Sequence, residues 1–147
     1  MLASLKLIDL VEKNAEEIAK QWVVEVKKNK RTPAYHNMPA EKLIPRAVEF
    51  YHQLRNRLMS ASTYEEADAY LLKYAKTCHE ENIPLHEAIY ALVLMRRQMW
   101  LFAEFQAVFT TVVEHQQAVD SVTRTMHMMD NAIHRIILHY QNLMKKK

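Results

Sequence analysis

The chain has 147 residues, half of them apolar and a quarter charged, a balance typical of a soluble globular domain rather than a disordered segment. Its formal net charge of +3 comes entirely from Lys145, Lys146 and Lys147, so no extended basic surface for nucleic acid is expected. Glycine is absent, which excludes P-loops, dinucleotide-binding fingerprints and nucleophile elbows. We therefore expect one domain over residues 1–147 whose function does not depend on a glycine-rich catalytic loop.

Cysteine content and hydropathy indicate the compartment. The single cysteine, Cys78, rules out an intrachain disulfide and favours a reducing environment. Lys6, Asp9 and Glu12 stand where a signal peptide needs an apolar core. The longest apolar run, residues 88–95, is far shorter than the roughly 20 residues that cross a bilayer. A cytoplasmic protein without membrane insertion is expected.

Periodicity in the N-terminal part predicts an amphipathic helix over residues 5–29. Asn29 is the expected C-terminal cap, because asparagine tolerates the left-handed conformation better than most residues. The helix carries apolar residues three and four apart on a single stripe. These are Ile8, Val11, Ala15, Ile18, Trp22 and Val26.

Two further helices are expected in the middle of the chain. Residues 39–60 form the first, because Pro39 suits the first turn of a helix. Residues 63–81 form the second, because Thr63–Glu66 has the pattern of a capping box, and Asn82 is its predicted C-terminal cap. The inward-facing positions of the pair are predicted to be Leu43, Ala47, Phe50, Tyr51, Leu54, Leu58, Ala67, Leu71, Tyr74 and Cys78.

The most apolar segment, residues 84–109, predicts a central helix. At about 100° per residue, one face gathers Leu85, Ile89, Leu92, Met99, Trp100 and Ala103, with Arg96 in the middle of it. A cation on a buried face must be paired, and Asp130 is the first candidate partner. Arg96 could instead bind an anionic ligand, or relay a signal through a breakable ion pair. Arg96, Asp130 and Trp100 are therefore the candidate ligand or switch residues.

The last predicted helix starts at Thr111 and runs to the C-terminus. Its apolar positions alternate three and four apart over more than three heptads, as in a coiled coil. This seam consists of Val119, Val122, Met126, Met129, Ile133, Ile136, Tyr140 and Leu143. It can pack within its own bundle, or against a second copy of the chain. A homodimer through this seam is the expectation.

Three polar residues on the last helix fit a metal-binding pattern. His127, Asp130 and His134 are three and four residues apart, a spacing that can direct side chains to one metal ion. The other helices offer no obvious fourth ligand. Metal binding is therefore an alternative to the main interpretation, and no cofactor is expected.

Three segments together resemble the RsbRD N-terminal domain family. They are IPLHEAIYALVLMRRQMWLF (residues 83–102), NAEEIAKQWVVEVKKNKRTPAY (residues 14–35) and MMDNAIHRIILHYQN (residues 128–142), in the order of that family. His86 departs from the usual pattern, where a small polar residue often stands. The resemblance implies an all-helical input domain that precedes a STAS domain of stressosome co-antagonists or a histidine kinase core. It implies no catalytic residues.

The sequence thus predicts an all-α bundle of about five helices with a long C-terminal helix. By resemblance, it is a non-enzymatic signal-input domain that relays a stimulus through residues 138–147 to a downstream effector. Since no effector is encoded in these 147 residues, a stand-alone relative and an isolated input domain both stay open. The alternatives are a small metal- or cofactor-binding protein using His127, Asp130 and His134, and a ligand-free interaction scaffold.

Overall fold

Helices provide all the regular structure in the computed structural model, which describes residues 3–54, 64–105 and 112–145. The all-α prediction and the long C-terminal helix are confirmed. In chain order the elements are α1 (Ala3–Lys13), α2 (Ala15–Val26), the 3-10 helix η1 (Pro33–Tyr35), α3 (Ala40–Gln53), α4 (Tyr64–Glu80), α5 (Leu85–Phe105) and α6 (Val112–Lys145). The predicted capping residues Thr63 and Thr111 lie outside the described residues, as does Leu58.

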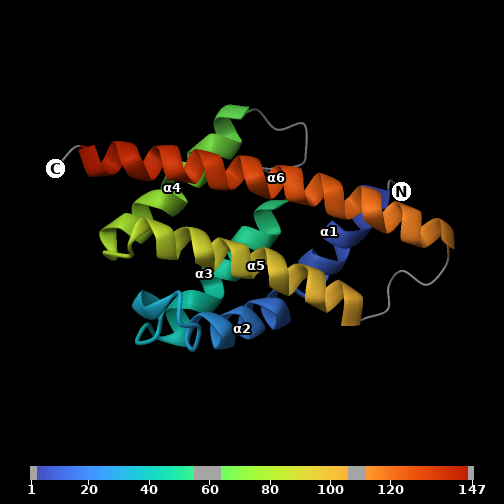
Figure 1. The fold of residues 1–147 in the computed structure, drawn as a ribbon, viewed down its shortest axis with the longest axis horizontal. Coiled ribbons are helices and arrows are strands. Elements are labelled where there is room, and N and C mark those ends of the chain that lie inside the picture. Colours follow the sequence, from blue (N-terminus) through green and yellow to red (C-terminus); the bar gives the residue numbers. More distant parts are fainter. Residues whose placement is uncertain (1–2, 55–63, 106–111, 146–147) are drawn as a thin grey trace.

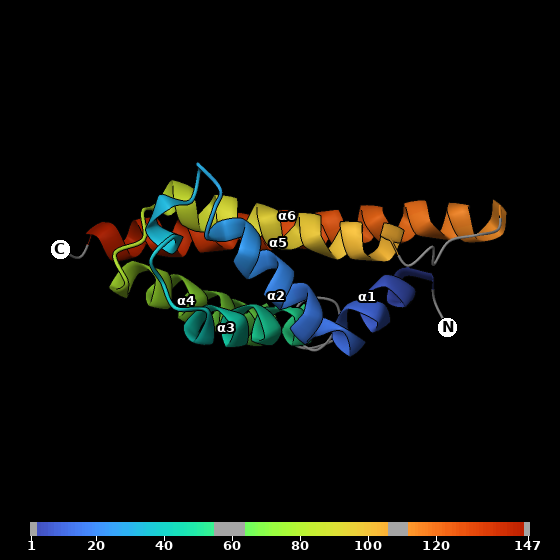
Figure 2. The ribbon, with the colours of Figure 1, turned by 90° about the horizontal axis from the view of Figure 1, so that it is seen from below.

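The helices are arranged around α5 and α6, which run antiparallel and side by side (Figures 1 and 2). In the view of Figure 2 these two form one layer, and α1, α3 and α4 lie in the layer facing it. The long helix α6 packs most extensively on α4 and α1, while α2 packs on α3 and α5. The core lies between the layers and takes side chains from every α-helix.

The first predicted helix is divided in two at Asn14. This residue leaves the helical conformation, with φ −119° and ψ 22°. Its side-chain amide donates to the carbonyl oxygen of Leu10 at 2.9 Å, which caps the end of α1, and its own carbonyl accepts from Ile18 as α2 begins. The apolar stripe continues across the break, since all six predicted positions are buried. Periodicity therefore identified the buried face but not the break.

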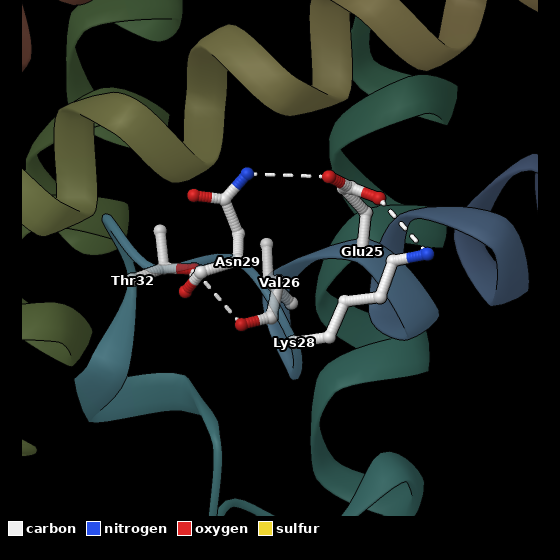
Figure 3. Close-up of polar contacts among 5 residues, drawn as sticks. All are labelled: Glu25, Val26, Lys28, Asn29 and Thr32. Carbon is white, nitrogen blue, oxygen red and sulfur yellow. Dashed lines mark hydrogen bonds and ion pairs between the residues drawn. The ribbon is translucent and has the colours of Figure 1, made fainter.

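The predicted cap at Asn29 is wrong. Helix α2 ends at Val26, and Thr32 caps it by donating its buried hydroxyl to the carbonyl of Val26 at 2.8 Å (Figure 3). The Asn29 side chain turns back to Glu25 instead, donating its amide to a carboxylate oxygen at 3.2 Å, while the other oxygen lies 3.7 Å from Lys28. Thr32, six residues after Val26, thus performs the capping that was assigned to Asn29.

The predicted cap at Asn82 is confirmed. Its φ of 61° is in the left-handed region, and it is the only positive φ in the described part of the chain. The amide of Ile83 bonds the carbonyl of Cys78 at 3.1 Å, and that of Asn82 bonds His79 at 3.0 Å, which is the Schellman pattern. Ile83 is then buried, and its carbonyl accepts a hydrogen bond from the hydroxyl of Tyr140.

Polar side chains of other elements fix α5 in the bundle. Trp22 of α2 donates its indole N–H to the carbonyl of Ala91 at 2.9 Å, and Tyr51 of α3 donates its hydroxyl to the carbonyl of Met95 at 3.0 Å. The buried carboxylate of Glu87 accepts the amide of Ala34 in η1 at 2.7 Å. These hydrogen bonds can form at only one rotation of α5 about its axis and one position along that axis. They therefore hold the helix in a single register against α2 and α3.

No helix in the described ranges is long and apolar enough to cross a membrane.

Candidate functional site

The candidate site is a cleft of about 340 Å³ between α5 and α6. It combines two guanidinium groups, an indole ring and thioether side chains. The residues that line it are Val93, Arg96, Arg97, Met99, Trp100, Thr125 and Met126. Two of the predicted candidates, Arg96 and Trp100, therefore share one cleft.

The structure corrects the position of Arg96 and Trp100 on α5. Arg96 is 29% exposed rather than central to the buried face, and Trp100 is 38% exposed rather than inward-facing. The face that enters the core consists of Ala88, Ala91, Leu92, Leu94, Met95, Met99 and Phe102. This face is turned by roughly 100° from the predicted one. Apolar residues surround most of α5, so periodicity alone did not determine which side α2 and α6 would cover.

The predicted ion pair between Arg96 and Asp130 is confirmed. Nη1 of Arg96 lies 3.1 Å from Oδ1 of Asp130, and it links α5 to α6 at the cleft. The Asp130 side chain is 62% exposed, so water competes for both groups. Exposed pairs of this kind stabilise a fold by about 0.2–1 kcal/mol. The link is therefore weak enough to be broken by a competing anion.

The cleft has a polar and an apolar part. Thr125 of α6 contributes a buried hydroxyl-bearing side chain, whereas Met126 beside it is among the exposed large apolar residues. Trp100 contributes the exposed aromatic surface on the α5 side. Small-molecule sites commonly combine apolar walls with a few convergent polar groups, which is the composition found here.

The predicted seam of α6 packs within its own chain. Of its described side chains, Met129, Ile136 and Tyr140 are buried, Ile133 and Leu143 are partly buried, and Met126 is exposed. The side chains of Val119 and Val122 lie outside the described part. Met129, Ile136 and Tyr140 are buried, and α6 packs on α1, α4 and α5 of the same molecule. The homodimer through this helix stays a prediction from the sequence.

The metal-binding alternative gains no geometric support. The side chains of His127, Asp130 and His134 are all exposed, and Asp130 is directed to Arg96. No group of three or more His, Cys, Asp or Glu side chains in the described ranges is arranged to hold a metal ion.

A polar cluster between α4 and α6 was missed by the sequence analysis. Oδ1 of Asp68 accepts from Nε of Arg135 at 2.9 Å and lies 2.8 Å from Nε2 of His139. The hydrogen bond from Arg135 lowers the pKa of Asp68, against the raising effect of burial, and His139 lowers it further. Arg135 and His139 are four apart on α6, so their shared face was readable, but their partner on α4 was not.

Comparisons with known proteins found no matching family model, no matching curated protein and no matching solved structure. The resemblance to the RsbRD N-terminal domain family stays a prediction from the sequence.

Proposed function

We propose that this chain is a signal-input domain whose α5–α6 cleft takes an amphipathic anion and passes its arrival to α6. One observation carries the proposal: Arg96 lines the cleft and also holds Asp130 of α6. An anion bound to Arg96 would compete directly with the carboxylate of Asp130. Occupancy of the cleft by an anion and the Arg96–Asp130 ion pair would then exclude each other.

The lining supports a particular class of ligand. Arg96 and Arg97 present planar donor groups that suit carboxylate, sulfonate or phosphate oxygens. Trp100 and Met126 supply exposed apolar surface for a ring or a short chain. The volume of about 340 Å³ lies within the range of small-molecule sites, roughly 300–1,000 Å³. The expected ligand is an aromatic or aliphatic acid rather than an ion alone.

The contacts of α5 support α6 as the helix that changes position when a ligand binds in the cleft. Hydrogen bonds from Trp22 and Tyr51 fix α5 against the rest of the bundle, whereas the polar link from α5 to α6 at the cleft is an exposed ion pair. A ligand changes a conformation only if it binds one state better than another. Here the preferred state is the one in which Arg96 has released Asp130.

The resemblance to the RsbRD N-terminal domain family supports the direction of the relay. In that family the input domain precedes its effector, so a change in α6 would leave the domain through its C-terminal end. Helix α6 continues without interruption from Asp130 to Lys145. A STAS domain or a histidine kinase core is the effector that the resemblance implies, and no catalytic role is proposed for this chain.

Binding is tested with 1-anilinonaphthalene-8-sulfonate, which joins an aromatic system to a sulfonate. We expect saturable fluorescence enhancement with the native protein, and about tenfold weaker binding by Arg96→Gln, because a hydrogen bond to a charged group is lost. Arg31→Gln is the matched control, since Arg31 stacks on Tyr90 and neither residue lines the cleft. Near-UV circular dichroism verifies that each variant is folded, because loosely packed states also bind this dye. Equal affinity of Arg96→Gln and the native protein would refute the assignment of the site.

The relay is tested by amide hydrogen exchange with and without the dye. Exchange in α6 around Asp130 should accelerate when the dye is bound, while the amides of residues 91–95 in α5 serve as the internal control. Dye binding that leaves α6 unchanged would support a binding protein without a relay. Failure of the dye to bind at all would favour the ligand-free scaffold.

A further inference from the structure

A second polar region lies between η1, α3 and α4, separate from the α5–α6 cleft. Four buried side-chain atoms there have no hydrogen-bond partner among the described residues. They are the hydroxyls of Tyr35 and Tyr74, Nη1 of Arg46 and Oε1 of Glu81. Buried polar groups are nearly always bonded to protein, water or a ligand, because leaving one unbonded costs about 1–3 kcal/mol. Four in one region therefore point to something that binds there.

The ion pair of Arg46 and Glu81 in this region uses only one guanidinium nitrogen and one carboxylate oxygen. Nη2 of Arg46 lies 2.6 Å from Oε2 of Glu81, and Nζ of Lys42 lies 2.8 Å from the same oxygen. The side chains of Arg46 and Glu81 are only 10% and 14% exposed. Burial alone would raise the pKa of Glu81, but the hydrogen bonds from Arg46 and Lys42 lower it below its ordinary value. The carboxylate is thus held ionised, while Nη1 of Arg46 has no hydrogen-bond partner among the described residues.

A small pocket of about 80 Å³ adjoins this ion pair. Two of the four unbonded groups, those of Arg46 and Tyr74, belong to residues that line it. The full lining is Arg46, Glu49, Tyr70, Lys73, Tyr74 and Thr77. Since a water molecule occupies roughly 30 Å³ in the liquid, the pocket has room for a few waters or for one small anion.

We infer that this pocket binds a small free oxyanion, which accepts hydrogen bonds from Nη1 of Arg46 and the hydroxyl of Tyr74. The unbonded guanidinium nitrogen can only donate, and an oxyanion supplies charged acceptor oxygens, so the two match. Lys73 adds a second cation to the lining, and the single carboxylate there, on Glu49, lies 3.5 Å from its ammonium. The lining therefore has one positive charge more than negative. The volume is too small for the larger ligand proposed for the α5–α6 cleft.

The state of Tyr74 is compatible with its role as a donor. Burial raises the pKa of this phenol well above its ordinary value. The hydroxyl therefore keeps its proton at neutral pH, and the Tyr74 side chain needs an acceptor.

The test uses sodium phosphate and sodium acetate as probes, with sodium chloride at equal ionic strength as the reference. Binding is followed by isothermal titration calorimetry and by the shift of the thermal unfolding midpoint. At least one probe should bind saturably and stabilise the native protein more than chloride does. Tyr74→Phe should weaken that binding by about tenfold, the value of one hydrogen bond to a charged group. Without added oxyanion, this variant should be at least as stable as the native protein, because an unbonded hydroxyl has been removed.

Tyr90→Phe is the matched control, because Tyr90 lies on α5 and does not line the pocket. Lys73→Met is the second variant and should weaken binding without disturbing the buried ion pair. Binding that is the same in Tyr74→Phe and the native protein would place the anion at another site and overturn the inference. So would stabilisation no larger than that given by chloride. Arg96→Gln should leave phosphate binding unchanged, which separates this result from the proposed function.

Discussion

Two of the arginine–carboxylate pairs among the described residues differ strongly in exposure. Arg46 of α3 and Glu81, which directly follows α4, are nearly buried, whereas Arg96 and Asp130 join α5 to α6 in contact with solvent. Loss of one partner has different effects on stability in the buried pair and in the exposed pair. In the buried pair, removing one partner leaves a charge that is largely shielded from water; in the exposed pair, water replaces the lost partner. The first pair is suited to holding a structure and the second to changing one.

The largest effect is expected from Glu81→Gln. The guanidinium of Arg46 would lose its counter-charge while staying nearly buried, so the free energy of unfolding should fall by about 3 kcal/mol. Urea unfolding at pH 7, followed by circular dichroism, measures this loss. Glu16→Gln is the control, because Glu16 is highly exposed and pairs with Lys20 within one helix, where the expected change is below about 0.5 kcal/mol. Similar losses in the two variants would remove the distinction between buried and exposed pairs.

An intermediate effect is expected at Asp68, whose exposure lies between those of the other two acids. Asp68→Asn should lower the free energy of unfolding by about 1–2 kcal/mol at pH 7, because the bonds from Arg135 and His139 lose their charged acceptor. Since the folded-state pKa of Asp68 is lowered, the unfolded chain takes up this proton first as the pH falls. The native protein should therefore lose stability as the pH falls below the ordinary carboxyl value of about 4.

Urea unfolding between pH 7 and pH 3 tests this prediction. Part of the acid sensitivity should remain in Asp68→Asn, because the pKa of Glu81 is lowered as well. An identical loss of stability with pH in the variant and the native protein would show that Asp68 is not one of the groups responsible.

The smallest effect on stability is expected from Asp130→Asn. The exposed pair should contribute less than about 1 kcal/mol, so the unfolding midpoint in urea should barely move. Affinity for the anilinonaphthalene dye should instead rise by about two- to fivefold, because the sulfonate no longer competes with the carboxylate for Arg96. Dye titration and urea unfolding of the same preparation measure the two quantities together. A variant that is much less stable, or that binds the dye no better, would contradict a competition between Asp130 and the ligand.

The sequence was informative where a helix has one apolar face. The stripe across residues 8–26 and the inward positions of α3 and α4 with described side chains were largely correct, although Ala67 is only partly buried. It was misleading at α5, where nearly every side is apolar, so that contacts with α2 and α6 decide which face is covered. The apolar alternation in α6 was recognised in the sequence. The same alternation occurs in helices that pack against a second chain and in helices that pack within their own bundle, so the sequence pattern does not distinguish the two.

Prediction of the ion pairs and pockets was limited in the same way, because they depend on how the helices pack. The pairing of Arg96 with Asp130 was predicted because a cation amid apolar residues needs a partner, and that reasoning held although the burial was overstated. The pair of Arg46 and Glu81 was missed, because neither residue stands on an apolar stripe, where a charge would have called for a partner. Both pockets need side chains from two helices, so no pattern within one helix could predict them.

The left-handed turn at Asn82 has a consequence for the unfolded chain. In most proteins glycine occupies such positions, and every glycine widens the range of backbone conformations that folding must restrict. This chain has no glycine and takes its positive φ with an asparagine. Replacing one glycine by alanine, where the backbone permits, stabilises a protein by about 0.4–1 kcal/mol through lower conformational entropy of the unfolded state. A chain without glycine has this advantage along its whole length. Its backbone loses less conformational entropy on folding, so a smaller part of the favourable packing free energy is offset.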